Sequence, residues 1–224
     1  MTATSYLVLL LVGVAHAGEI ITSPPTTNWG VWGAFDRCPN GTFARGFQLK
    51  TEPYKGPLID DTAGNAIRLY CGAPGVDEDA GTVTSSEGAY GVWGSISSCP
   101  IGSYINGFAL RVEVNGIDDE TATNNVRFYC NTLPDPLEGD GLGFGLWRDS
   151  RRCSTSEALC AFQTQIEAPQ GLADDTSLNN IAAECCDLPV PTTPPPTTTT
   201  PRPTTTTPTT TTPTTTTSQP ETTL

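Results

Sequence analysis

Acidic side chains gather at one point in each of three similar segments of this 224-residue chain. In each segment a glutamate is followed, six to eight residues later, by two adjacent acidic residues and a threonine. Two carboxylates on either side of a glycosidic bond can act as the acid and the base of a glycosidase. Beside threonine and asparagine they can instead accept backbone N–H bonds and form turns, and three repetitions of one group favour that structural role. The groups are Glu52 with Asp60 and Asp61, Glu113 with Asp119 and Glu120, and Glu167 with Asp174 and Asp175.

The third acidic group differs from the other two in its charged neighbours. Two cations lie at fixed offsets from each of the first two groups, where they can pair with the carboxylates. The cations are Lys50 and Arg68 in the first segment and Arg111 and Arg127 in the second, and the third segment has Gln165 and Ala182 instead. We therefore expect Glu167, Asp174 and Asp175 to be the best candidates for binding a glycan or a cation, unless the arginines within residues 148–152 compensate.

The N-terminal residues 1–17 have the features of a signal peptide. Their apolar run is too short to span a bilayer, and a small-x-small pattern ends at Ala17. Cleavage there predicts a secreted protein and removes His16 and Met1, the only histidine and the only methionine. Without histidine the mature chain has no Ser-His-Asp or Cys-His nucleophilic site and no His-ligated metal centre.

The chain is acidic, with a net charge of −13 and a pI of about 4.2. It contains no run of basic residues, and binding to phosphate groups needs clustered lysine and arginine. Nucleic acid and anionic membrane surfaces are therefore not expected as partners.

Eight cysteines lie in the mature part, an even number that predicts a disulfide framework. Zinc is disfavoured, because the chain has no C-x-x-C pair and most spacings are near thirty residues. The repeat spacing predicts the pairs Cys38–Cys71, Cys99–Cys130, Cys153–Cys185 and Cys160–Cys186. The alternative pairing, Cys153–Cys186 with Cys160–Cys185, stays open, since the sequence does not show which of two adjacent cysteines belongs to which bond.

The three segments are copies of one repeat. Residues 29–33 recur at 90–94 and again at 144–148, each time as an aromatic residue, glycine, an aliphatic residue and tryptophan. In every copy a cysteine follows six residues after the tryptophan, and an asparagine stands six residues before a second cysteine. This periodicity predicts three equivalent structural units. They span about residues 29–71, 90–130 and 144–186.

Within a repeat, apolar and polar residues alternate as they do in half-buried strands, for example from Phe47 to Glu52. Clusters of Gly, Pro, Asn and Asp interrupt each run, so we expect an all-β domain without long helices. The predicted organisation is a short lead at 18–28, the three-repeat domain at 29–188 and a tail at 189–224. The tail has 20 Thr and 10 Pro in 36 residues, which predicts a disordered, mucin-like, O-glycosylated segment.

The repeated aromatic residues can either fill the core or bind sugar rings. We expect Trp32, Trp93 and Trp147 to be buried, because large aromatic residues next to glycine at a fixed position are typical of cores. Trp29 is expected to be exposed and is a candidate ligand-binding residue. Asn40 begins an Asn-Gly-Thr sequence after Pro39, which predicts both a tight turn and an N-glycosylation site.

The pattern W-G…C-P-x-G…G-F…L-[KR]…E…D-D-T-A…N…R…C resembles that of the vitelline membrane outer layer protein I family, from Trp29 to about Cys186. The resemblance implies a β-prism of three Greek-key sheets about a pseudo-threefold axis. It also implies an extracellular role in the outer layer of the egg's vitelline coat, and a chito-oligosaccharide transfer likened to that of lysozyme is attached to the family. The tail lies outside the resemblance and can place this protein in another mucous or matrix layer.

We therefore expect a structural or glycan-binding component of an extracellular coat, with glycans or glycoproteins as partners. No catalytic residue, metal or cofactor is assigned. The alternatives are a carboxylate-based enzyme acting on chito-oligosaccharides and a defensive lectin, the second by analogy of fold alone.

Overall fold

Each repeat contributes one long antiparallel hairpin to the fold. The computed structural model describes residues 18–25, 28–56, 62–113, 123–169 and 176–190. The hairpins are β4 (Phe43–Thr51) with β5 (Gly64–Gly72), β9 (Ile105–Val112) with β10 (Thr123–Cys130), and β14 (Glu157–Ile166) with β15 (Leu178–Asp187). Most of their residues are buried, and partly exposed residues such as Gln48 and Arg68 stand between buried apolar ones. The expected all-β fold is confirmed.

Short strands complete each hairpin to a five-stranded sheet. Sheet A contains β1 (Ile20–Thr22), β15, β14, β2 (Val31–Trp32) and β3 (Asp36–Arg37). Sheet B contains β6 (Asp79–Val83), β5, β4, β7 (Val92–Trp93) and β8 (Ser97–Ser98). Sheet C contains β11 (Leu137–Glu138), β10, β9, β12 (Leu146–Trp147) and β13 (Arg151–Arg152).

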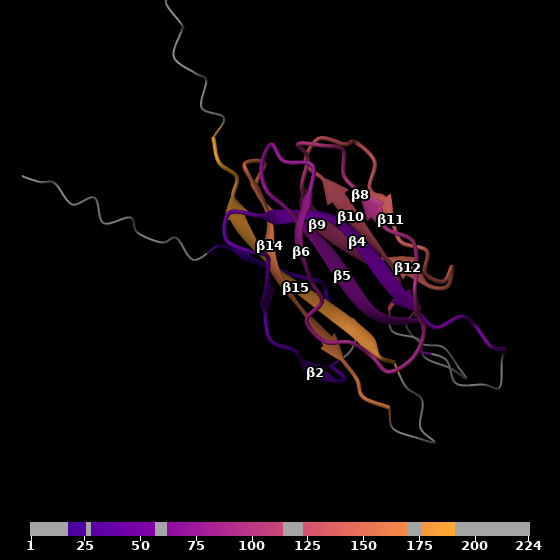
Figure 1. The fold of residues 1–224 in the computed structure, drawn as a ribbon. Coiled ribbons are helices and arrows are strands. Elements are labelled where there is room, and N and C mark those ends of the chain that lie inside the picture. The colour runs from indigo at the N-terminus through magenta and orange to yellow at the C-terminus, as the bar shows by residue number, and fades with distance from the viewer. Residues whose placement is uncertain (1–17, 26–27, 57–61, 114–122, 170–175, 191–224) are drawn as a thin grey trace, which may run out of the picture. The chain divides into compact units, whose positions relative to one another are not determined.

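The short strands of one repeat pair with the hairpin of the repeat before it. β7 and β8 belong to the second repeat and pair with β4 of the first, and β12 and β13 of the third repeat pair with β9. The series closes on itself, because β2 and β3 of the first repeat pair with β14 of the third. In Figure 1 the indigo strand β2 accordingly lies beside the orange strands of the third repeat.

A glycine is required where each repeat meets the preceding one. Gly30, Gly91 and Gly145 have φ values of +80°, +82° and +74°. A Cβ atom on Gly30 would lie 2.4 Å from the carbonyl carbon of Ile166, and the other two glycines are equally close to the backbone of β4 and β9. The aromatic-glycine pair of each repeat is thus a docking element, because only glycine combines this backbone conformation with this approach.

The three sheets curl around one hydrophobic core. Its largest fully buried side chains include Phe47, Phe108, Phe128 and Phe162. The rings of Phe47 and Phe128 have centroids 4.7 Å apart, which joins the first repeat to the second. The expected prism of three sheets is confirmed in this core, where β4, β9 and β14 contact one another.

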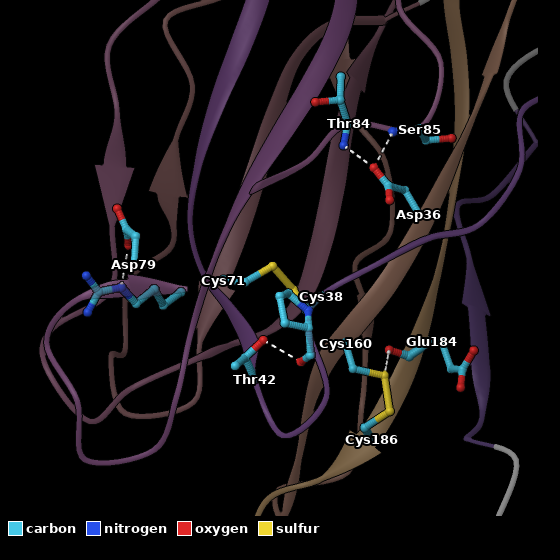
Figure 2. The surroundings of a disulfide bond; sticks show 12 residues. Asp36, Cys38, Thr42, Cys71, Asp79, Thr84, Ser85, Cys160, Glu184 and Cys186 are labelled. Carbon is cyan, nitrogen blue, oxygen red and sulfur yellow. Dashed lines mark hydrogen bonds and ion pairs between the residues drawn. A yellow bond between two sulfur atoms is a disulfide. The ribbon is translucent and has the colours of Figure 1, made fainter. Parts of the chain in front are cut away.

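Four disulfides connect strands within the repeats. They are Cys38–Cys71, Cys99–Cys130, Cys153–Cys185 and Cys160–Cys186. Figure 2 shows Cys38–Cys71 beside the additional bond Cys160–Cys186 of the third repeat. It also shows the Asp36 carboxylate accepting the backbone N–H groups of Thr84 and Ser85, at 2.8 and 3.4 Å between nitrogen and oxygen. The three equivalent disulfides, Cys38–Cys71, Cys99–Cys130 and Cys153–Cys185, join residues 31 to 33 positions apart. Closing a loop of this length is worth about 3 to 4 kcal/mol in the chain-entropy model.

The chain divides into two units, Met1–Pro189 and Val190–Leu224. The predicted signal peptide and nearly all of the predicted tail lie outside the described residues. Within the described residues, no helix is both long enough and apolar enough to cross a membrane.

Substitution of the adjacent cysteines tests the pairing. Cys186→Ala should leave Cys160 with a free thiol, whereas Cys185→Ala should free Cys153, because each variant removes one partner of a different bond. Alkylation of the denatured, unreduced proteins followed by peptide mass spectrometry identifies the thiol. Labelling of Cys153 in Cys186→Ala would show the exchanged arrangement.

Candidate functional site

The glutamate of the acidic group is part of a turn at the end of a long strand. Oε2 of Glu52 accepts bonds from the backbone N–H and the hydroxyl of Thr62, at 3.1 and 2.9 Å. Glu167 makes the same two contacts with Thr176, at 3.3 and 2.6 Å. A carboxylate that accepts neighbouring N–H and O–H groups in this way fixes the local backbone.

Residues at or next to the start of the second long strand of each repeat meet in a buried polar cluster. Asn65, Asn124 and Asn179 stand at equivalent positions and are fully buried. The Ser177 hydroxyl donates to Oδ1 of Asn65 at 3.0 Å, which joins the third repeat to the first. The Thr123 hydroxyl donates to the backbone oxygen of Asn179 at 3.3 Å, which joins the second repeat to the third. Buried and hydrogen-bonded polar groups of this kind specify one arrangement of the repeats.

Glu52 is ionised at neutral pH in spite of its burial. Burial raises the pKa of its carboxyl, but the hydrogen bonds from Lys55 and from both donors of Thr62 outweigh this effect. The pKa of Glu52 is consequently lowered from its ordinary value. A lowered pKa makes Glu52 a poor general acid, and with the turn contacts it favours the structural role for this carboxylate.

Glu52→Gln should destabilise the protein in a pH-dependent way. Because the folded-state pKa is lowered, the carboxylate contributes stability above its ordinary pKa, and that contribution is lost as the pH falls through the folded-state pKa. We expect a loss of about 1 to 3 kcal/mol at pH 7, the cost of weakening a buried charged network. Urea unfolding at pH 7 and at pH 2 should show that the difference from wild type disappears in acid.

Glu138→Gln is the matched control for this experiment. Glu138 pairs with Arg127 at 2.7 Å, and its side chain is 43% exposed. Exposed pairs contribute little, so its loss should be below about 1 kcal/mol at both pH values. An equal loss in Glu52→Gln at pH 7 and pH 2 would contradict the role given to the Glu52 charge.

The predicted pairing of Lys50 and Arg68 with the first acidic group is wrong for Glu52, while Asp60 and Asp61 lie outside the described residues. Nζ of Lys50 donates to Glu87 at 2.7 Å and to the backbone oxygen of Gly88 at 2.9 Å. Arg68 lies over the ring of Trp93 instead, and the described partner of Glu52 is Lys55. The prediction failed because both Glu87 and Trp93 come after the first repeat, and sequence offsets within one repeat do not show them.

The predicted burial of the repeated tryptophans is also wrong. Trp32 is 37% exposed, and Trp93 and Trp147 are half-buried. They lie on the outer faces of the sheets, because the short strands β2, β7 and β12 turn them away from the core. Phenylalanines from the long strands fill the core in their place.

The structure places the remaining candidate residues in different surroundings. Trp29 is exposed at 43% of its surface, next to the strand β2. Glu167 directly follows β14 and holds the Thr176 turn. Asp174 and Asp175 lie outside the described residues. Asn40 is exposed in the turn between β3 and β4.

Exposed aromatic residues occur at the same position in all three repeats. Trp29, Tyr90 and Phe144 have 43%, 42% and 42% of their surface exposed. Each stands before the docking glycine and therefore beside the end of a long strand of the preceding repeat. Tyr54 packs against Phe144 with ring centroids 5.3 Å apart and is itself exposed. These rings form exposed apolar surface on a rigid support.

A cavity of about 280 Å³ lies between the Asn40 turn and the additional disulfide. Arg37, Thr42, Phe43 and Asp187 are among the residues that line it. The nearby group of Cys160, Glu184 and Cys186 has the spacing of a metal site. Its two sulfur atoms are bonded to each other, however, and so are not thiolate ligands.

The fold is that of the β-prism proteins, with three curled antiparallel sheets around one core. The chain belongs to the family described as Vitelline membrane outer layer protein I, whose pattern matches residues 19–188. The human Vitelline membrane outer layer protein 1 homolog is 43% identical over 160 residues, which are 70% of this chain and 78% of the human protein. The mouse homolog is 40% identical over 193 residues, 80% of this chain and 94% of the mouse protein.

A solved structure shows the same fold at much lower sequence identity. The crystal structure of Calystegia sepium agglutinin has a TM-score of 0.51, with 13% identity over 78% of this chain and 99% of that one. This similarity concerns the fold alone. The family and the four disulfides are consistent with an extracellular protein.

Proposed function

We propose that this protein is a secreted structural component of an extracellular coat, the egg vitelline outer layer or a similar mucous or matrix layer, and that it binds glycans there. The observation that carries the proposal is the exposure of aromatic rings on all three repeats of a disulfide-linked prism. Exposed aromatic surface marks an interaction site, because an aromatic ring on a rigid support offers a flat apolar platform. Trp29, Tyr90 and Phe144 are such rings.

The rigid support favours a structural rather than a catalytic role. The buried Glu52 and the matching Glu167 hold turns, and one buried polar cluster joins all three repeats at the start of β5, β10 and β15. A disulfide-linked prism of this kind resists unfolding outside the cell, where coat components must persist. The fold shared with an agglutinin supports a glycan as the partner.

The Thr/Pro tail would extend and hydrate the coat. Its composition is that of O-glycosylated mucin-like segments, which stay extended because they bury almost no apolar surface. Glu167, Asp174 and Asp175 of the third repeat, together with Trp29, stay candidates for ligand contacts.

A glycan array probed with the full secreted chain tests the proposal. We expect binding to one or more oligosaccharides and no turnover of chito-oligosaccharides in a parallel assay. Glu167→Gln, Asp174→Asn and Asp175→Asn identify the contribution of the third acidic group. Turnover that a single one of these substitutions abolishes would contradict the structural role, and the absence of any glycan binding would contradict the binding role.

Asn40 is proposed as the site of an N-linked glycan. The turn is closed by the backbone N–H of Thr42, which donates to the oxygen of Pro39 at 3.0 Å, and Gly41 has a φ of +76°. Asn40 therefore stands exposed at the tip of this turn, as Ile101 does in the second repeat. The glycan would stand at the rim of the 280 Å³ cavity.

Release of N-linked glycans with a peptide N-glycosidase should lower the mass of the secreted protein, and Asn40→Gln should show no such loss. Thr42→Ser keeps the hydroxyl that the sequence motif needs and serves as the control, whereas Thr42→Ala removes it. An identical mass of wild type and Asn40→Gln before deglycosylation would contradict occupancy of Asn40.

A further inference from the structure

The outer faces of sheets B and C each carry a tryptophan covered by an arginine. The guanidinium carbon of Arg68 lies 4.0 Å from the ring centroid of Trp93 on sheet B. That of Arg127 lies 3.9 Å from the ring centroid of Trp147 on sheet C. Each arginine comes from the second long strand of the hairpin and reaches across the first. Such a cation stack occupies the ring face that a ligand would need.

Sheet A has the tryptophan without the covering arginine. On β14, Gln165 pairs with Trp32, and Gln163 pairs with Ala182. Ala182 stands where the other sheets have Arg68 and Arg127, and its methyl group is too short to reach Trp32. Within the described residues no lysine or arginine lies over the Trp32 ring. Trp32 is accordingly the exposed member of the three.

The other arginines near this face are held elsewhere. Arg37 of β3 forms an ion pair with Glu184 of β15. Arg151 donates from Nε to the backbone oxygen of Thr22 at 2.9 Å. Arg37 and Glu184 neutralise each other, whereas Arg151 has no ion pair among the residues described but contacts β1, at the opposite edge of sheet A from Trp32.

A neutral polar group stands near the open ring on the same face of the sheet. Gln163 stands two residues from the partner of Trp32 and so on the same face, and within the described chain its side-chain amide makes no hydrogen bond. The equivalent Gln48 of sheet B is fully engaged, because it donates to Gly94 and accepts the Tyr70 hydroxyl. Thr22 is exposed on β1 opposite Ala182, but it stands three strands from Trp32, about 14 Å away, and is too far to contact a sugar ring stacked there.

We propose that the outer face of sheet A binds an uncharged sugar, with the Trp32 ring as the platform and the Gln163 amide as a hydrogen-bonding group. The C–H face of a pyranose ring matches an open aromatic ring, and its hydroxyls match an amide. A charged ligand is disfavoured at Trp32, because Arg37 and Glu184 are paired with each other and Arg151 lies at the other edge of the sheet. The inference rests on the proposed glycan-binding function and gives it a site and a ligand class.

Ala182→Arg tests the site by restoring the cover that sheets B and C possess. Arginine occupies the same position in both other repeats, and because Ala182 is only 2% exposed, the melting temperature of the variant checks that sheet A accepts the longer side chain. Titrations of the full secreted chain with chitotriose, mannotriose and lactose identify a sugar that binds. For that sugar we expect Ala182→Arg and Trp32→Ala each to weaken binding at least about tenfold, with the melting temperature nearly unchanged in Ala182→Arg.

Two further variants serve as controls. Trp93→Ala, on the covered face of sheet B, should leave the affinity unchanged. Arg68→Ala should expose Trp93 and add at most a weaker second binding event, because Gln48 stays engaged with Gly94 and Tyr70 and offers no free amide.

The outcomes separate this inference from the function on which it rests. If wild type binds a glycan and neither Trp32→Ala nor Ala182→Arg weakens the binding, the site on sheet A is wrong while the glycan-binding function stands. If only Trp29→Ala weakens sugar binding, the binding site lies at the repeated aromatic residues and the site proposed on sheet A is wrong. If wild type binds none of the sugars, on the array or in titration, both proposals are contradicted.

Discussion

The pairing of β2 and β3 with β14 is the contact on which the rest of the molecule depends. Every repeat gives its short strands to the hairpin of the repeat before it, so no repeat contains a complete sheet. The third sheet of the prism is complete only when β2 and β3 of the first repeat pair with β14 of the third. This sharing makes the three repeats one cooperative unit, and it explains why the docking glycines Gly30, Gly91 and Gly145 are needed at each junction.

Strand sharing also decides what the repeated tryptophans do. A tryptophan on a two-residue strand stands at the rim of another repeat's sheet, on its outer face. There it meets side chains of the preceding repeat, which are Arg68 for Trp93 and Arg127 for Trp147. Where that neighbour is Ala182, Trp32 is left uncovered. The loss of the arginine in the third repeat thus changes one place on the surface, the outer face of sheet A at Trp32.

Much of this fold was predictable from the sequence, because its signals are periodic. Alternating residues from Phe47 to Glu52 predict a strand, and the equal cysteine offsets indicate bonds within each repeat. The loss of two cations in the third repeat was also visible in the sequence. The sequence did not show that this loss uncovers a tryptophan, because the partner of Arg68, Trp93, belongs to the next repeat. In addition, a two-residue strand is too short to show the alternation from which its buried face could be predicted. The burial of tryptophans was mispredicted for the same reason.

The side-chain resonances of the four tryptophans, followed by NMR as a neutral oligosaccharide such as chitotriose is added, test the central claim most directly. Each indole N–H gives a separate signal, and the glutamine amides report on the same titration. The account predicts that the signals of Trp32 and of the Gln163 amide shift and saturate together, while those of Trp93 and Trp147 stay in place. Saturation with an unchanged Trp32 signal would contradict it, as would equal shifts at all three repeats.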